Sequence, residues 1–326
     1  LFVIIGNSIL EIKGMWFEFW LIMFTTSSFS NLLGLVISST FNSAKVIYIV
    51  IPLIIIPQLL FSGVIVKFDK LHPSLSTATK VPWIGNLMVS RWSYEALAVE
   101  QATQNKFERN FLKLEISKSN AEWKKDYWSQ EIKQQIRNLD SKNNAIKKEA
   151  AEILQREIQL EEAYWTNLKC IDCYWTKGNI TKFDEHKIQA FLYKARTQYS
   201  SFIAQDNKFI DAKIDEIGKE KYIELERDYV NNALMMVVTN KMEVDKLIID
   251  KDQIYRNDNP IYNLPKNVSF LGSHFYAPYK YIFGNKISTY HANILFIWLM
   301  SIFMYALLYF DAFKVALSWI LRIVRK

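Results

Sequence analysis

Three long runs without a charged residue dominate the pattern of apolar and polar positions along the chain. They cover residues 19–44, 46–66 and 292–310, and Trp and Tyr lie near their edges. A helix rises about 1.5 Å per residue, so each run can cross a hydrocarbon core roughly 30 Å thick. Trp and Tyr at the ends favour membrane helices over buried helices of a large soluble core. The pattern predicts three membrane-spanning helices.

The first ten residues are apolar but too few to cross a bilayer. Glu11, Lys13 and Gly14 follow as a short polar hinge. We expect this stretch to be the outer end of an earlier span whose beginning lies before Leu1. A signal peptide is the competing interpretation, but a basic start and a small-residue cleavage site are both lacking.

The first two runs differ in the residues that interrupt their apolar surface. Residues 19–44 are rich in small and hydroxyl side chains. Such residues let helices approach and hydrogen-bond across an interface, although Ser and Thr can also bond back to their own helix. Pro52 and Pro57 in the second run each remove a backbone donor. We expect a bent helix there, as in many channels and transporters, or a kink with a structural role only.

A further apolar stretch at residues 81–99 contains two charged residues. Arg91 and Glu95 lie four positions apart, so they can pair on one face of a helix. A segment broken in this way predicts re-entrant or interfacial helices rather than a full crossing.

Charge is concentrated between residues 105 and 290, which hold 30 of the 40 Lys and Arg and 27 of the 33 Asp and Glu. The net charge of +7 is dilute and mixed with acids, which argues against nucleic acid as a partner. Apolar residues recur at helical spacing over residues 105–168 and 182–238, and short β-prone pieces follow to residue 290. We expect a mostly helical, water-facing domain, built as an antiparallel coiled coil or as a compact bundle.

Few residues in the chain are candidates for catalysis or metal binding. Cys170 and Cys173 form a C-x-x-C, for which a local disulfide is the first interpretation and two free thiols the second. A lone pair without a second pair or a nearby His argues against zinc. The four histidines are scattered. We expect no catalytic residue and no metal site in this chain.

The basic end of the chain predicts its orientation. Arg322, Arg325 and Lys326 belong in the cytoplasm by the positive-inside rule. Counting back, residues 105–290 lie outside, and the link between the first two runs is cytoplasmic. The residues after Asp311 form either an amphipathic helix on the inner surface or an extension of the last span. We expect a multi-pass protein of the plasma (inner) membrane with a cytoplasmic C-terminus.

Several motifs follow one another in order along the apolar parts of the chain. A hydroxyl-rich span, FWLIMFTTSSFSNLLGLVISS, precedes an apolar span that ends in LLFSGVIV, and WIGNLMVSRWSYEALAVEQ follows. With a last span before a short basic tail, this order resembles the membrane (permease) half of G-type (White-like) ABC transporters over residues 1–104 and 285–326. Ser62 and Gly63 match the family's FSG step. The outer re-entrant motif is matched loosely by Ser90, Arg91, Tyr94 and Glu95.

The resemblance implies an all-α membrane protein, the helical transmembrane bundle of a type-two ABC exporter permease. Its first spans and N-terminal ATPase domain would precede Leu1. It also implies a substrate cavity lined by Ile56, Leu59, Leu60 and Phe61, closed on the outside by an apolar valve of Val64 and Ile65. The insertion at residues 105–290 is larger than in familiar eukaryotic members and looks more like bacterial members with an enlarged, mostly helical extracytoplasmic domain.

The expected organisation has four parts. Residues 1–66 hold the end of one span and two full spans, 67–104 the re-entrant or interfacial outer helices, 105–290 the extracytoplasmic helical domain, and 291–326 the last span and basic tail. No G-x-x-x-x-G-K-[ST] motif occurs in the sequence. We therefore expect that the chain is not itself an enzyme and that ATP and Mg bind at a missing or partner ATPase domain.

Two functions are compatible with the sequence. The first is the permease part of an ATP-driven exporter, a homodimer or a pair with a related half-transporter, which moves a hydrophobic or amphipathic substrate by alternating access. The alternative is a membrane-anchored sensor or scaffold whose helical outer domain binds an envelope partner. The reading frame upstream of Leu1 separates them, because a Walker A motif there favours the exporter.

Overall fold

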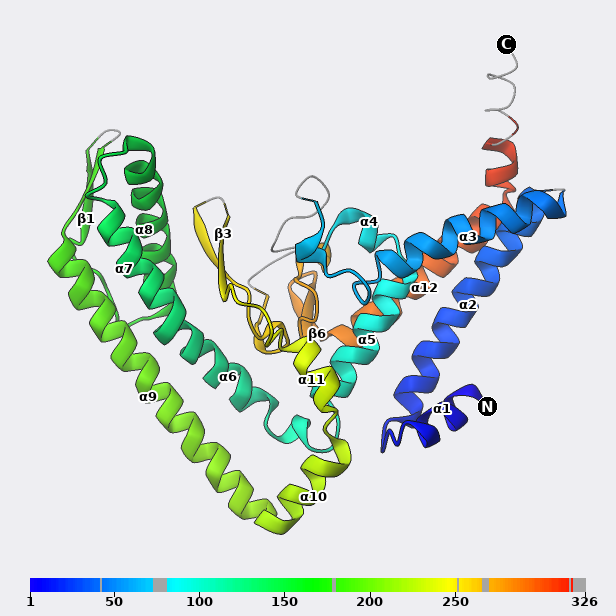
Figure 1. Cartoon of the computed structure of the whole chain (residues 1–326), viewed down its shortest axis with the longest axis horizontal. Helices are drawn as coiled ribbons and strands as arrows, with labels where there is room; N and C mark the ends of the chain where they lie inside the picture. Colours follow the sequence, from blue (N-terminus) through cyan, green and yellow to red (C-terminus); the bar gives the residue numbers. More distant parts are fainter. Residues whose placement is uncertain are drawn as a thin grey trace. The chain divides into compact units, whose positions relative to one another are not determined.

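The computed structural model describes residues 1–41, 43–72, 81–177, 180–250, 252–265, 270–316 and 318 (Figure 1). The protein is mostly helical, and its described strands form three separate two-stranded antiparallel hairpins. It divides into two compact units. Unit 1 comprises residues 1–109, 225–238 and 264–326, and unit 2 comprises residues 110–224 and 239–263. Each unit has a hydrophobic core of its own.

Unit 1 is built around three helices that contact one another. Its helices are α1 (Phe2–Ile9), α2 (Trp16–Thr40), α3 (Ala44–Leu60), α4 (Trp83–Asn86), α5 (Val89–Thr103), α11 (Asn232–Val238) and α12 (Thr289–Tyr309), and its hairpin is β5 (Tyr279–Ile282) with β6 (Asn285–Ser288). Helix α12 packs along both α2 and α5, and α2 packs along α5. Ser288 begins α12 by accepting a hydrogen bond from the His291 amide, which satisfies one of the free donors of the first turn.

A narrow stripe of each long helix faces the core of unit 1. The buried residues recur at intervals of seven on both helices: Ile22, Phe29 and Val36 of α2, and Tyr290, Ile297 and Met304 of α12. This spacing keeps them on one face. The exposed residues of α12 are mostly apolar, whereas those of α2 are apolar in its first half and mostly small or polar in its second half. Helices α2 and α12 are each long and apolar enough to cross a membrane, and a lipid-facing surface explains the exposed apolar residues.

Helix α3 is shorter than the uncharged run that contains it. We predicted a span over residues 46–66, but α3 ends at Leu60 and has 17 residues, or about 25 Å. The Ser62 hydroxyl donates to the Leu59 carbonyl at 2.7 Å and accepts from the Val64 amide at 3.2 Å. Gly63 has φ +82°, and a Cβ there would lie 2.6 Å from the Phe275 ring. The prediction of one helix to residue 66 was wrong because this turn redirects the backbone.

The hydroxyl groups of α2 mostly serve their own helix. Within the described residues, five side chains donate to carbonyls three or four positions earlier: Thr26, Ser28, Ser30, Ser39 and Thr40. Thr25 differs, because it is fully buried and its hydroxyl has no partner among the described residues. Of the two predicted roles for these hydroxyls, bonding back to the helix therefore accounts for most. The predicted basic tail, Arg322, Arg325 and Lys326, lies outside the described residues.

Unit 2 is a helical structure with two short hairpins. Its elements are α6 (Leu112–Trp123), a π-helical turn (Lys124–Trp128), α7 (Ser129–Asn138), α8 (Asn144–Tyr164), β1 (Tyr174–Lys177), β2 (Ile180–Phe183), α9 (Glu185–Ile217), β3 (Leu247–Asp250) and β4 (Gln253–Arg256). Helix α9 runs beside α6 and α7, and α8 folds back on α7 (Figure 1). Helix α10 (Lys219–Tyr229) contains the boundary at residue 224. Of the two predicted arrangements, the packing of α7, α8 and α9 is that of a small bundle.

The core of unit 2 lies where α7, α8 and α9 meet. Its largest fully buried aliphatic residues are Ile132, Ile153, Leu154, Ile158, Ile188 and Leu192. Asn143 and Asp184 cap α8 and α9 through their side-chain oxygens, and Gly218, at φ +88°, follows the end of α9. These local signals fix the helix ends that bring the apolar faces together.

The boundaries of unit 2 differ from the predicted insertion at residues 105–290. Residues 225–238 and 264–290 fall in unit 1, because α11 packs on α5 and the β5–β6 hairpin contacts α12. The predicted insertion is therefore split between two cores.

Candidate functional site

The end of α3 carries the residues predicted to line a cavity. Helix α3 has no buried residue, and its main contact is α5. Ile56, Leu59 and Leu60 are 54, 51 and 41% exposed. Val64 and Ile65, in the turn that follows Gly63, are 53 and 62% exposed. An apolar surface of this extent is covered by lipid, by substrate or by another protein surface.

A cluster of buried charged and polar side chains lies where α5, α12 and β5 meet. Arg91 and Glu95 lie one turn apart on α5, as predicted from their spacing, and their nearest atoms Nη2 and Oε2 are 3.4 Å apart. Lys280 of β5 reaches the same carboxylate oxygen at 2.5 Å. Asn293 of α12 donates to that oxygen at 2.8 Å and accepts from Lys280 at 2.8 Å. All four side chains are at most 2% exposed.

The cluster combines two cations with one anion. The centroid of the Trp92 ring lies 3.9 Å from the Arg91 guanidinium carbon and 4.5 Å from Lys280 Nζ, so the ring quadrupole attracts both cations although the ring carries no net charge. Glu95 Oε1 and Arg91 Nε and Nη1 are buried without a hydrogen-bond partner among the described residues. Burial lowers the pKa of the Lys280 ammonium, while the Glu95 carboxylate opposes that change. Such a network is costly if one partner is removed.

Helix α5 packs along α12 and α2. Near its end, Glu100 is close enough to Glu18 of α2 for their charges to interact, and Tyr290 at the start of α12 donates to the Glu18 carbonyl at 2.8 Å. At its beginning, the rings of Trp92 and Phe296 pack in a tilted arrangement with centroids 4.1 Å apart. A helix of 15 residues is about 22 Å long and so too short to cross a hydrocarbon core of roughly 30 Å. The re-entrant or interfacial position of this segment stays a prediction.

The four residues of the loosely matched outer motif do not form one site. Ser90 binds Gln58 of α3, with its amide at 3.2 Å and its hydroxyl at 2.5 Å. Tyr94 accepts a hydrogen bond from Tyr276 at 3.2 Å. Only Arg91 and Glu95 belong to the buried cluster. Sequence reasoning missed Lys280 and Asn293, although an Asn inside the uncharged run 292–310 is a signal that could have been followed.

Cys170 and Cys173 form a disulfide in unit 2, with Cα atoms 5.4 Å apart. Both cysteines are buried in the hydrophobic core of that unit, so the disulfide is part of the core packing.

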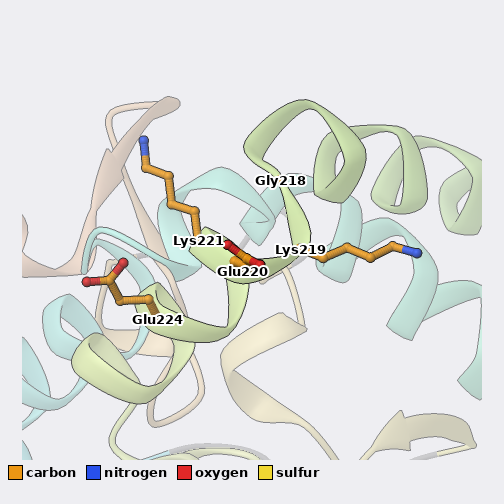
Figure 2. Close-up of a pocket in the computed structure, with 5 residues that line it drawn as sticks. All are labelled: Gly218, Lys219, Glu220, Lys221 and Glu224. Carbon is orange, nitrogen blue, oxygen red and sulfur yellow. The ribbon is translucent and has the colours of Figure 1, made fainter.

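A shallow depression at the start of α10 is lined by Gly218, Lys219, Glu220, Lys221 and Glu224. Figure 2 shows that its long side chains point in different directions. Nothing in it converges on a ligand, and it is no candidate site.

Comparison with known proteins gives one finding. Residues 1–101 match the family model of the ABC-2 type transporter. No curated protein and no solved structure matches the chain. The matched segment contains α1 to α4 and nearly all of α5, and so includes α3 and the helix that is its main contact. The match supports an ABC-2 permease in a membrane, the kind of domain that typically pairs with an ATP-binding cassette component.

Proposed function

We propose that this chain is the permease part of an ATP-driven exporter of the G-type (White-like) ABC class. In this proposal two copies, or one copy and a related half-transporter, enclose a cavity and alternate its access. The substrate is a hydrophobic or amphipathic molecule. Unit 2 is an extracytoplasmic insertion, and the chain is of bacterial type.

The observation that carries the proposal is the exposed α3 within the segment that matches the transporter family. This 17-residue apolar helix has no buried residue and its main contact is α5, so most of its apolar surface is left for another partner. Pro52 and Pro57 lie inside this helix and have no backbone N–H, so carbonyl groups of the preceding turn lose their donors and need a neighbour or a wet cavity. A facing α3 from a second copy supplies the neighbour, and the space between the copies supplies the cavity. Ile56, Leu59, Leu60 and Phe61 would line it.

ATP hydrolysis belongs to another component in this proposal. The sequence has no Walker A motif, so ATP and Mg would bind at a cassette domain outside residues 1–326. This chain would contribute the substrate pathway, whose two access states the cassette domain would interconvert.

The orientation rests on contacts within unit 1. Lys13 in the hinge before α2 forms an ion pair with Asp228 at 2.8 Å, so the hinge lies on the same side as the segment that returns from unit 2. Tyr290 places the start of α12 level with Glu18. We take this side as external because the opposite end of α12 leads to the basic tail.

A reversible crosslink in α3 tests the proposal. The chain has two cysteines, both in the disulfide, so a single Ile56→Cys variant carries the one added thiol. In vesicles that contain the permease with its cassette, oxidation should join two copies through Cys at 56 and reduce ATP turnover at least tenfold, and a reductant should restore it. Phe303→Cys on the exposed face of α12 is the matched control. A crosslink at 56 that leaves ATP turnover unchanged would favour the sensor or scaffold.

A further inference from the structure

The β5–β6 hairpin carries a phenylalanine that is completely exposed. Phe283 is 100% accessible at the tip of the hairpin, in a two-residue turn with Gly284. Both residues have positive φ, 48° for Phe283 and 82° for Gly284. Turns of this kind favour Asn or Gly at the first position, and a bulky residue there is strained. A large apolar side chain in a strained and fully exposed position does not stabilise the chain by itself and indicates an external contact.

The two faces of this hairpin differ. Cross-strand partners share a face, and successive residues alternate. Lys280, opposite Ile287, points into the buried cluster with Glu95 and Asn293. The other face presents Tyr279, Tyr281 and Lys286, because Tyr281 lies opposite Lys286.

The tyrosine face combines aromatic rings with a cation. Lys286 Nζ lies 3.8 Å from the centroid of the Tyr279 ring. Tyr side chains with an apolar body and a polar tip, together with Lys, are typical of the level at which a membrane meets water.

The hairpin is held at the level where the apolar helices begin. β6 ends at Ser288, and α12 begins at Thr289 (Figure 1). Lys280 bonds to Asn293, one turn into α12. At the same level the first turns of α2 expose Trp16, Phe17 and Trp20, which are 42, 64 and 49% accessible. An aromatic belt of this kind marks a membrane surface.

We propose that the β5–β6 hairpin is a membrane-interface anchor. Phe283 inserts among the lipids at the surface where α12 begins, while Tyr279, Tyr281 and Lys286 lie at the level of the headgroups. The anchor fixes the hairpin, and through Lys280 it fixes the buried cluster relative to the bilayer. It needs α12 to span the membrane, as in the proposed function, but it does not need the chain to transport anything.

Photocrosslinking tests this anchor. Benzoylphenylalanine replaces Phe283 in the full chain, which is placed in vesicles of phosphatidylcholine and phosphatidylglycerol, irradiated and analysed by mass spectrometry. The same group at Tyr193, 74% exposed on α9 of unit 2, is the control for a water-facing site. At Phe303, 62% exposed on α12, it is the control for a lipid-facing site. We expect lipid adducts at 283 and 303, at least ten times more abundant than at 193.

The outcomes separate the anchor from the assignment on which it rests. Lipid adducts at 303 without an excess at 283 would overturn the anchor alone. A protein adduct at 283 in place of lipid would also overturn it and would point to an envelope partner. Absence of lipid adducts at both 283 and 303 would overturn the anchor together with the assignment of α12 as a span. Failure of ATP-driven transport would leave the anchor standing.

Discussion

Glu95 is the one anion beside Arg91 and Lys280 among the described residues of the buried cluster in unit 1. The consequences of removing each partner therefore differ. Without Glu95, two cations remain buried beside neutral groups such as the Trp92 and Phe275 rings and Asn293. Without Lys280, the Arg91–Glu95 pair remains and the charges balance.

We predict that Glu95→Gln is more damaging than Lys280→Met. An uncompensated buried charge costs about 3–5 kcal/mol, so Glu95→Gln should lower the free energy of unfolding by about that amount. Lys280→Met keeps the length of the side chain and should cost less. Thermal unfolding in detergent measures both. An equal loss of stability in the two variants would contradict the charge balance described for this cluster.

Local spacing predicted half of this cluster. Arg91 and Glu95 are four residues apart, a distance that helical geometry converts into a contact. Lys280 and Asn293 are 185 and 198 residues from Glu95. These long-range contacts depend on how the fold brings β5 and α12 against α5. Residue spacing in a single sequence does not predict such contacts.

At the scale of elements, the sequence predicted some helix ends well and missed others. The start of α12 was predicted to within three residues, because the helix begins at Thr289 and the uncharged run was placed from residue 292. The end of α3 was missed because the apolar run continues through Val64 and Ile65, while the Ser62 bonds and the positive φ of Gly63 end the helix. Hydropathy indicates whether a segment lies in an apolar environment. It does not indicate where the backbone leaves the helical conformation.

The α8–α9 contact in unit 2 depends on a buried carboxylate. Glu161 of α8 accepts hydrogen bonds from Lys124 at 2.6 Å, from Trp165 at 2.9 Å and from Tyr199 of α9. Burial opposes its ionisation, but Lys124 and these donors outweigh burial, so the pKa of Glu161 lies below its usual value of 4.5. Its contribution to stability is fully present above pH 4.5 and is lost as the pH falls through the lowered pKa.

We predict that α8 loses protection from hydrogen exchange in acid and that Glu161→Gln removes part of this pH dependence. At neutral pH the variant should lose about 3 kcal/mol, or roughly a hundredfold in protection factor, because Lys124 is left buried without its anion. Protection factors corrected for the intrinsic effect of pH measure this in the full chain. Glu152→Gln is the control, since Glu152 on the same helix is 48% exposed in a surface pair. Equal effects of the two variants would contradict the role of Glu161.

At the scale of the whole molecule, the segregation of charge predicted two different environments, and the structure has two units. The boundaries were harder to predict. The prediction placed residues 264–290 with the charged block although they carry only three charged side chains, Lys266, Lys280 and Lys286, and in the structure Lys280 joins them to α5 and α12. Membership of a unit was set by tertiary contacts, which composition does not record.

We predict that residues 110–263 fold without the rest of the chain. They contain the whole core of α7, α8 and α9, and the disulfide that lies against it. Far-UV circular dichroism should show a helical spectrum and a cooperative thermal transition. The same fragment with Leu154→Ala, which removes a fully buried core side chain, should melt at a lower temperature, for a cost of about 2–5 kcal/mol. A coil-like spectrum or a gradual transition in the parent fragment would show that unit 2 depends on unit 1.

The turn after α3 bears on coupling in the proposed transporter. Val64 and Ile65 are exposed in one copy, and Gly63 holds this turn against Phe68 and Phe275. In the proposed dimer these two residues meet their counterparts from the second copy. Bulky apolar side chains that meet at a two-fold axis exclude water, and they can separate without breaking hydrogen bonds.

We predict that Val64→Ala with Ile65→Ala weakens the outer seal and uncouples ATP hydrolysis from export. Both residues are exposed in one copy, so the double variant should unfold at nearly the same temperature as the parent protein. ATP turnover should persist while transport per ATP falls several-fold, because substrate can return through the open seal. Reconstituted vesicles that contain the cassette component allow both rates to be measured together. Leu299→Ala with Ile302→Ala, at exposed apolar positions of α12, controls for general loss of apolar surface. If this control and the valve variant change the coupling ratio equally, or if neither changes it, Val64 and Ile65 do not form the valve.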